Sequence, residues 1–599
     1  MPDGSSHDWQ SARRRFLKMG GVAGAAALAG CSSETPSEGG AGSTTSTSGD
    51  GGSGGSGDNS LTIPGRYIPT NMQWNSYAPS HYAVVGGRAV YDPFIFYNQK
   101  TDELIPYLFQ DWTLEGKTLT VTIRDGVTWH DGEPVTAEDF VTKFTIDKGF
   151  GYEVGNYIES ATAVDEKTVE YALADAYRAK TILLVFNGTW LDTPTHQKFG
   201  EFAQRFRDAS TKEEKQKVQG DIQNYQPSEP VGCGPFEFDS ANQQTLTLTT
   251  YADHPDASNV KFDTYEVVYF ASSQQKWANM KNDAGIDVLN GFTPRRIVKT
   301  FPDYVREYQV PRYNGYALAF NHSDEDFGKR NVRRAVANVI DQNKMANLAD
   351  PTKHPVTAPA GVGSFVTGTW EENLGGDVSS YDTYTNTEKA AELLRSEGYT
   401  KQGGKWYKPN GDQLTVEIPT PSGWSDVASF TTTVAQMLSD FGIEAQKRGV
   451  ENTTFFGQYW GPSNFQMVPW FWNNSGKTKP FFSLSWILTS NTVMSTLGYD
   501  EKPKAPPMGN PDGEPQEVDV QSKLRELGTT SDQQRVTELT RELAWVVNQD
   551  LPMLPLIEKV RPSFWNTNEW DVPPKDTDKK FVNWCNYYWP RFGYVTPKQ

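Results

Sequence analysis

Cysteine and histidine are scarce in this sequence. Its 599 residues include three Cys and seven His, and no CxxC pair or Cys/His cluster has the spacing of a metal site. We therefore expect no metal and no cofactor.

Export of the chain would permit a disulfide between Cys233 and Cys585. We expect two buried free thiols, with that disulfide as the alternative.

Long apolar runs and an excess of basic residues are also missing. The weakly apolar stretch Met19–Gly30 is Gly- and Ala-rich and shorter than the roughly 20 residues that span a bilayer. The formal net charge is −18, and a field of that sign repels nucleic acid and anionic lipid headgroups. We therefore expect no nucleic-acid partner. The acidic balance also suits concentrated salt, so a halophile-like source is a further expectation.

The N-terminus carries the pattern of an export signal. Arg13–Lys18 is a basic head, an apolar run follows, and Leu28-Ala29-Gly30-Cys31 ends in small residues. The paired arginines before Phe-Leu-Lys resemble the twin-arginine signal, and the last four residues resemble a lipobox whose Cys31 becomes the lipid anchor. The alternatives are a membrane-spanning helix or a disordered basic tail. We predict an extracytoplasmic protein, tied by lipid to the outer face of the cell membrane.

Residues 32–60 are almost entirely small and polar, so we expect a disordered Gly/Ser linker that buries no surface. About 540 residues follow, which is too many for one hydrophobic core, and two or three domains are expected.

With 18 Trp, 27 Tyr and 31 Phe, the chain is rich in aromatic rings. Flat apolar rings with one polar edge suit binding surfaces, although most of them belong to cores.

Local patterns predict several elements of the body. Residues 119–123 alternate as in a strand. Thr136 is typical of a helix N-cap, with Asp139 at the third helical position. Strand 414–418, a helix over 430–441 that ends at Gly442, and strand 443–450 predict a βαβ unit with parallel strands. Apolar spacing predicts further helices near 331–340 and over 388–397.

Several motifs together resemble one family, the extracytoplasmic solute-binding proteins of peptide/nickel-type ABC transporters (family 5). They occur in the family's order from about residue 61 to the C-terminus. Their residues are Ile105-Pro106, Asp111-Trp112, Arg124-Asp125-Gly126-Val127, Trp129-His130-Asp131-Gly132, Thr136-Ala137-Glu138-Asp139, Val231-Gly232-Cys233-Gly234-Pro235-Phe236, Asn331–Asp341, Ala390–Tyr399 and Asp550–Leu556.

The resemblance implies an α/β fold, namely a two-lobe periplasmic-binding-protein type II fold with an additional small α/β domain. Ligand would enter between the lobes, which close over it. Residues 61–99, 230–320 and 545–599 would form lobe I, residues 100–229 the extra domain, and residues 321–544 lobe II. The implied function is the substrate-binding component of an ABC importer, not an enzyme. Its expected partners are a solute, a permease and ATPase subunits, and we expect a monomer.

Two segments of the chain bear on the class of solute. Dipeptide binders of the family use an acidic residue for the amino group and often an arginine for the carboxylate. Here the matching segments, 469–477 and 419–424, contain neither, and a buried unpaired charge costs several kcal/mol. An oligopeptide-like solute is the main prediction, and a neutral oligosaccharide is the alternative, since indoles stack on sugar faces and amides bind hydroxyls. The expected ligand-binding residues are Tyr77, Trp424, Trp472, Asn473 and Asn474.

Two other classes of protein remain open. In an exported hydrolase His130-Asp131 could form a catalytic pair, although a structural turn before the Thr136 helix is the simpler interpretation. No Gly-x-Ser-x-Gly or His-Glu-x-x-His motif occurs, but sequence does not exclude two carboxylates placed for glycoside hydrolysis. A signalling receptor domain or adhesin is the third class.

Overall fold

The structure is a computed structural model of the chain. It describes residues 59–65, 67–79, 81–291, 293–349, 353–356, 358–363, 374, 379–422, 424–473, 479–582 and 585–598. The predicted signal, lipobox and linker lie outside the described residues, except for Asn59 and Ser60. The described chain packs into two compact units: unit 1 holds residues 176–181 and 309–561, and unit 2 holds residues 59–175, 182–308 and 562–598. The three-part division into lobe I, extra domain and lobe II stays a prediction.

Unit 2 is built around two four-stranded sheets, of order β1-β10-β9-β8 and β4-β5-β7-β6. Its strands are β1 (Ser60–Gly65), β2 (Ile95–Asn98), β3 (Glu103–Pro106), β4 (Phe109–Glu115), β5 (Thr118–Ile123), β6 (Ile158–Ala163), β7 (Thr168–Leu173), β8 (Phe236–Ala241), β9 (Thr245–Thr250), β10 (Thr264–Tyr269), β11 (Val288–Asn290), β22 (Trp570–Asp571) and β23 (Thr596–Pro597). Its helices are η2 (Pro69–Asn71), α2 (Val84–Val90), α3 (Ala137–Gly149), α4 (Val154–Tyr157), η3 (Thr195–Phe199), α6 (Gly200–Asp208), α7 (Lys212–Asn224), η4 (Ala257–Asn259), α8 (Ser273–Lys281), α9 (Arg295–Val298), η7 (Asp578–Phe581) and α19 (Cys585–Arg591).

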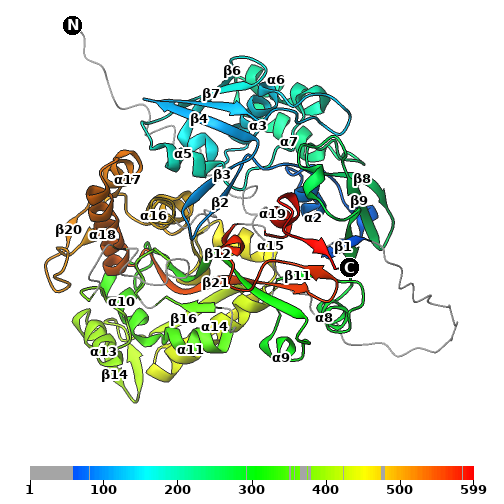
Figure 1. Cartoon of the computed structure of the whole chain (residues 1–599). Coiled ribbons are helices and arrows are strands. Elements are labelled where there is room, and N and C mark those ends of the chain that lie inside the picture. The colour runs from blue at the N-terminus through cyan, green and yellow to red at the C-terminus, as the bar shows by residue number, and fades with distance from the viewer. Residues whose placement is uncertain are drawn as a thin grey trace, which may run out of the picture. The chain divides into compact units, whose positions relative to one another are not determined.

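The second of these sheets shows why its sequence folds as it does. Leu119, Val121 and Ile123 of β5 are fully buried, as their alternation predicts. Helix α3 packs against β6 and β7 of this sheet (Figure 1). A capping box starts the helix, since Thr136 and Asp139 satisfy each other's backbone N–H groups. The predicted strand and helix start are therefore confirmed.

Unit 1 carries the remaining elements. Its strands are β13 (Lys353–Pro355), β14 (Thr400–Gln402), β15 (Lys405–Tyr407), β16 (Thr415–Pro421), β17 (Glu444–Val450), β18 (Met467–Asn473), β19 (Lys504–Ala505) and β20 (Gln516–Glu517). Its helices are α10 (Arg330–Val339), α11 (Gln342–Ala349), α13 (Thr387–Ser396), α14 (Ser425–Phe441), α15 (Asn452–Thr454), η5 (Phe455–Trp460), α16 (Pro480–Thr489), η6 (Thr492–Thr496), α17 (Val520–Thr529) and α18 (Gln533–Asp550). In three elements the chain passes from one unit to the other: α5 (Ala179–Val185), β12 (Val305–Phe320) and β21 (Met553–Asn566).

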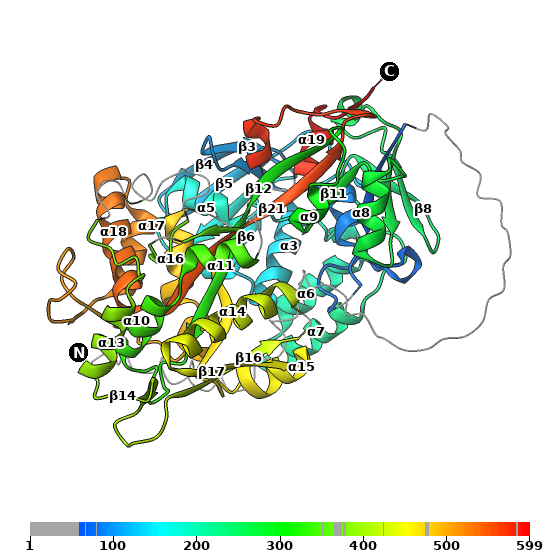
Figure 2. The ribbon, with the colours of Figure 1, turned by 90° about the horizontal axis from the view of Figure 1, so that it is seen from below.

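The predicted βαβ unit is confirmed. Strands β16 and β17 pair in parallel, and α14 packs against both of them (Figure 2). The helix ends at Gly442, whose φ of 103° lies in the left-handed region that glycine adopts without strain. Helices α10 and α13 lie where the apolar spacing predicts them.

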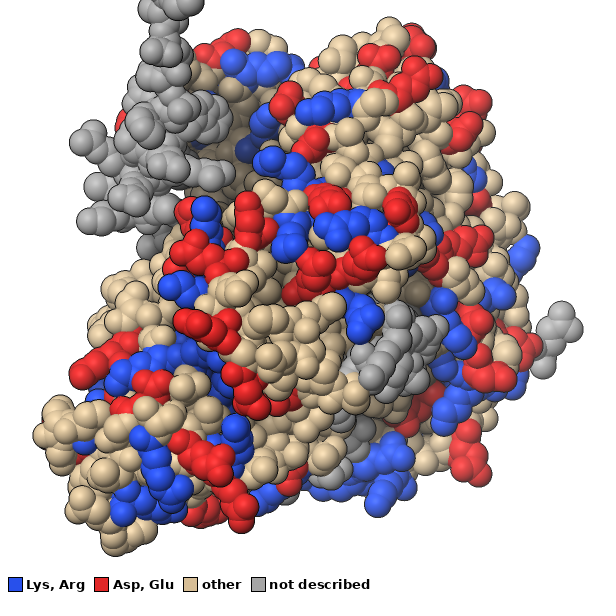
Figure 3. Space-filling model, turned by 90° about the vertical axis from the view of Figure 1, so that its left-hand side faces the viewer, with Lys and Arg blue, Asp and Glu red and all other residues tan. Residues whose placement is uncertain are grey.

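Charged side chains of both signs occur on one face of the molecule (Figure 3). On the face that Figure 3 shows, acidic and basic side chains lie interspersed among uncharged ones. Within the described ranges, no helix combines the length and apolar character needed to cross a bilayer.

Candidate functional site

Aromatic rings gather in unit 1 where β16 leads into α14. Trp424 is the N-cap of that helix, and its ring lies 6.3 Å from Trp470 and 6.0 Å from Phe471, both on β18. Phe456 of η5 lies 6.2 Å from Trp424 and 6.4 Å from Trp470. We call Trp424, Phe456, Trp470 and Phe471 the aromatic platform. The predicted site residue Trp424 is thus part of a larger cluster.

Solvent reaches the platform at only some of its rings. Trp424 and Trp470 are 6% and 8% exposed, whereas Phe456 and Phe471 are partly exposed. Trp460 of η5, itself 7% exposed, stacks on Trp470 with 3.6 Å between ring centroids. A ligand that used this surface would therefore meet the two phenylalanine rings first, with the indoles as their backing.

A lysine that the sequence analysis missed lies beside the platform. Lys559 of β21 donates a hydrogen bond to the Tyr316 hydroxyl at 2.6 Å. Its ammonium lies 4.3 Å from the centroid of the Tyr316 ring and 5.8 Å from that of Phe471, within the range of cation–π attraction. Strands β12 and β18, which carry Tyr316 and Phe471, pair antiparallel with these two residues opposite each other.

Trp472 lies in the packed interior of unit 1. It is 2% exposed, and its indole N–H donates to the carbonyl oxygen of Ile557 at 3.0 Å. Gly315 of β12 makes room for this bond, because a Cβ there would lie 2.0 Å from the Trp472 Nε1. Asn473 ends β18 and is 2% exposed, and Asn474 lies outside the described residues. A ligand role for these three residues stays a prediction.

Tyr77 belongs to a buried charged network in unit 2. It is 4% exposed; its hydroxyl donates to Asp147 at 2.6 Å and accepts from Lys143 at 2.8 Å. Burial, followed by the charge of Asp147, raises the pKa of Tyr77 well above its ordinary value. Its ring stacks on that of Tyr152, 5.9 Å away, which is 41% exposed. The network gives Tyr77 a structural role, and contact with a ligand stays a prediction.

His130 and Asp131 do not form a pair. The His130 Nε2 lies 2.9 Å from the carbonyl oxygen of Gly234, and burial lowers the pKa of His130 to about 4. Asp131 instead lies 2.7 Å from His196 and accepts from Gln197. This arrangement favours the structural turn over a catalytic pair.

Cys233 and Cys585 are both buried free thiols. Burial raises the pKa of Cys233 well above its ordinary value, so the thiolate form is disfavoured. Among the residues that the structure describes, no three His, Cys, Asp or Glu side chains gather as metal ligands would.

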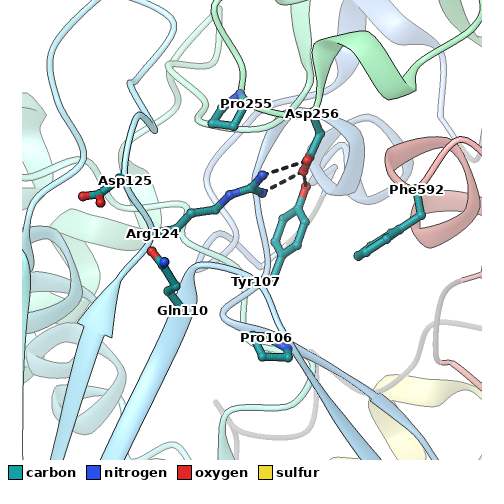
Figure 4. A pocket seen from close by; sticks show the side chains of 8 residues that line it. All are labelled: Pro106, Tyr107, Gln110, Arg124, Asp125, Pro255, Asp256 and Phe592. Atoms are coloured by element: carbon teal, nitrogen blue, oxygen red, sulfur yellow. Dashed lines mark hydrogen bonds and ion pairs between the residues drawn. The ribbon is translucent and has the colours of Figure 1, made fainter.

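Unit 2 contains a surface pocket of about 430 Å³ (Figure 4). Arg124 donates to both oxygens of Asp256, at 2.7 and 2.8 Å, and Tyr107 donates to the same carboxylate. Hydrogen bonding to Asp256 raises the pKa of Arg124. The remaining lining residues are Pro106, Gln110, Asp125, Pro255 and Phe592. Because Arg124 and Asp256 neutralise each other, the pocket offers a ligand less charge than its residue types suggest.

Comparisons with known proteins agree on one family. A sequence profile described as "Bacterial extracellular solute-binding proteins, family 5 Middle" matches residues 103–494. A probable ABC transporter-binding protein of Deinococcus radiodurans is 32% identical over 110 residues, or 17% of this chain and 18% of the relative. A probable peptide ABC transporter periplasmic-binding protein of Sinorhizobium fredii is 23% identical over 60% of this chain and 64% of its own length. The chain thus spans less than two thirds of either relative.

Solved structures share the fold across nearly the whole chain. A periplasmic oligopeptide-binding protein of Thermotoga maritima superposes with a TM-score of 0.72 at 19% identity, covering 90% of this chain and 99% of that one. A second structure of that protein, described as bound to mannohexaose, gives a TM-score of 0.68 at 19% identity, with coverages of 91% and 99%. The predicted two-lobe type II binding-protein fold is therefore confirmed.

Proposed function

Since the chain belongs to the bacterial extracellular solute-binding proteins of family 5, we propose that it is the extracytoplasmic substrate-binding component of an ABC importer. It captures an oligopeptide-like solute and delivers it to a membrane permease. The match of the family profile over residues 103–494 carries this proposal. Relatives described as peptide transporter-binding proteins support the class of solute. The chain is then a binding protein and not an exported hydrolase.

The platform is the surface of unit 1 that this role uses. Phe456 and Phe471 are partly exposed and pack against the buried indole of Trp470, and aromatic rings of this kind pack against apolar side chains or sugar rings. Trp424 packs against both phenylalanine rings, with centroid distances of 6.2 Å to Phe456 and 6.0 Å to Phe471.

A neutral oligosaccharide is the second candidate solute. Segments 419–424 and 469–477 lack the charged residues that clamp dipeptides, and the Thermotoga relative has been solved with mannohexaose. Both observations agree with an aromatic surface that binds through stacking.

Export and anchoring complete the proposal. A twin-arginine signal carries the folded chain out, and Cys31 then bears the lipid that holds it at the outer face of the membrane. A single acyl chain gives only marginal membrane binding, whereas two chains anchor a protein stably.

Native purification of the full chain, followed by mass spectrometry of the solute released on denaturation, tests the function. We expect an intact oligopeptide or oligosaccharide that stays intact on incubation with the protein. We further expect Phe471→Ala to weaken rebinding of that solute about tenfold, or about 1.4 kcal/mol, by calorimetric titration. Phe592→Ala, in the pocket of unit 2, is the matched control and leaves affinity unchanged. Cleavage of the solute by the protein would contradict the proposal.

A further inference from the structure

Four Asn-Gly pairs occur in this chain, beginning at Asn187, Asn290, Asn314 and Asn410. Asparagine before glycine is the dipeptide that loses ammonia most readily, because glycine has no side chain to hinder attack of its backbone nitrogen on the preceding carboxamide. Both reacting groups must be free to approach each other. The fold therefore decides which of the four pairs reacts.

The turn after α5 leaves both groups of one pair unbound. The Thr189 N–H donates to the Phe186 carbonyl oxygen at 2.9 Å and closes a turn around Asn187 and Gly188. Within the described chain, the Gly188 N–H makes no hydrogen bond, and the amide nitrogen of Asn187 is buried without a partner. Gly188 is exposed, with a φ of 88°, and a Cβ there would meet nothing within 4 Å. Nucleophile and electrophile are thus adjacent and unbound, with water beside them.

The pair at Asn410 is held at both reacting groups. The Gly411 N–H donates to the Lys408 carbonyl oxygen at 2.9 Å. The Asn410 amide donates to the Asp412 carboxylate at 2.9 Å, and its side-chain oxygen accepts the Asp412 backbone N–H at 3.0 Å. Asn410 is exposed, but these bonds must break before its side chain can react.

Strands hold the other two pairs. Asn290 ends β11, which pairs with β21, and the Gly291 N–H donates to the Pro562 carbonyl oxygen at 3.1 Å. Gly315 lies in β12, which pairs with β18, and a Cβ on it would lie 2.0 Å from the Trp472 Nε1. A paired strand in such close packing resists the bend that ring closure requires.

We propose that Asn187 is a modification site, at which the protein deamidates without an enzyme. The deprotonated Gly188 nitrogen attacks Cγ of Asn187, and the new bond closes a five-membered succinimide ring. The Cγ–Nδ2 bond breaks, and ammonia leaves with the proton that the Gly188 nitrogen gave up. Water then opens the ring at either carbonyl, which yields aspartate or isoaspartate. Each product gains a carboxylate, and isoaspartate also brings Cβ into the backbone.

The turn lies between two anchors of the aromatic core of unit 2. Phe186 is 2% exposed, and its ring lies 5.0 Å from Phe109 and 5.1 Å from Tyr171. On the other side of the turn, the Thr189 carbonyl oxygen accepts the Phe94 N–H at 3.0 Å. An added backbone atom between the two anchors displaces one against the other, so the isoaspartyl form should be less stable.

The hydrogen bonds set the expected order of rates. Asn187 should deamidate at least about fivefold faster than Asn410 or Asn290, which is the rate equivalent of one net hydrogen bond of about 1 kcal/mol. The exposed fraction alone would favour Asn410 instead, so the two explanations predict opposite orders.

Ageing of the full chain at neutral and at mildly alkaline pH, followed by proteolysis in acid and mass spectrometry, measures the rate at each Asn-Gly pair. Asn290 and Asn410 are internal controls. The chain unfolded in guanidinium chloride is the control for the fold, and there all four pairs should react at similar rates. Asn187→Gln is the matched variant, because its longer side chain would have to close a less favourable six-membered ring.

We expect Asn187 to react first in the folded chain, and faster as pH rises, because attack requires the deprotonated Gly188 nitrogen. Aged wild type should melt at a lower temperature than Asn187→Gln aged alongside it. Equal rates at Asn187 and Asn410 in the folded chain, or faster reaction at any of the other three pairs, would overturn the inference. Equal melting temperatures of the two aged proteins would overturn the effect on stability.

Discussion

At the scale of single residues, His130 shows how surroundings decide a side chain's chemistry. Its ring is enclosed so tightly that a Cβ on Gly232 would lie 2.7 Å from the imidazole Cε1. Burial disfavours the charged imidazolium, and the carbonyl oxygen of Gly234 holds the neutral ring through Nε2. The residue that could have been a catalytic base is thus a neutral packing group.

This burial makes stability depend on pH. The folded pKa of His130, about 4, lies below the value near 6.5 of an unfolded histidine. Between these pH values the unfolded chain takes up a proton that the folded chain does not, so stability falls as pH falls. From pH 7 to pH 4 we expect the unfolding free energy of wild type to fall by about 3 kcal/mol more than that of His130→Gln.

Urea denaturation at several pH values measures that difference. His196→Gln is the control, because it replaces an exposed histidine and retains His130. Its unfolding free energy should still show the fall in acid that His130 causes. An unchanged difference between wild type and His130→Gln across this range would show that His130 does not titrate as its burial implies.

Gly315 marks a close approach of three strands. A Cβ at this position would lie 2.0 Å from both the Ile557 carbonyl oxygen and the Trp472 Nε1, the two ends of one hydrogen bond. We expect Gly315→Ala to lower the free energy of unfolding by about 1–3 kcal/mol, as overpacked core substitutions do. Thermal or urea unfolding checks this against Gly449→Ala in β17, where a Cβ meets nothing within 4 Å. Equal stability of the two variants would disprove the steric argument.

At the scale of elements, the parts that the sequence predicts well are those with local causes. The N-cap at Thr136 and the left-handed Gly442 each depend on residues within one or two helical turns. Asp139 shows where such reasoning ends. Its carboxylate also accepts the backbone N–H of Thr195 and the indole N–H of Trp129, and neither partner follows from helix spacing.

Much of the candidate site could not be predicted either, because it also depends on contacts between residues that are distant in sequence. Trp424 could be named because it stands in segment 419–424, which matches the strand-end loop that can carry an arginine in dipeptide binders of the family. Lys559 could not, because only the pairing of distant strands brings β21 near Tyr316 and Phe471. Tyr77 could be named as an aromatic residue, but its burial depends on Lys143 and Asp147 from α3, which its own neighbourhood in sequence does not reveal.

At the scale of the whole molecule, net charge is the property with the widest effect. The formal charge of −18 repels itself in the compact state, and screening shortens from about 10 Å in 0.1 M salt to about 3 Å in 1 M. We therefore expect the melting temperature to rise by several degrees between these NaCl concentrations in scanning calorimetry.

A matched variant separates self-repulsion from other effects of salt. Replacing exposed Glu115, Glu133 and Glu170 by Gln removes three negative charges, which brings −18 to −15, and should reduce the rise. A melting temperature that falls with NaCl would mean that ion pairs stabilise the fold more than net charge destabilises it.

The stacked pair Trp460–Trp470 has an optical consequence. With 3.6 Å between centroids and 22° between ring planes, the transition dipoles of the two indoles couple, and the pair absorbs polarised light as one chromophore. Circular dichroism of the indole bands then reports the angle between the rings. A solute that shifts Trp470 would change this signal without any added label, so the proposed binding surface contains its own spectroscopic probe.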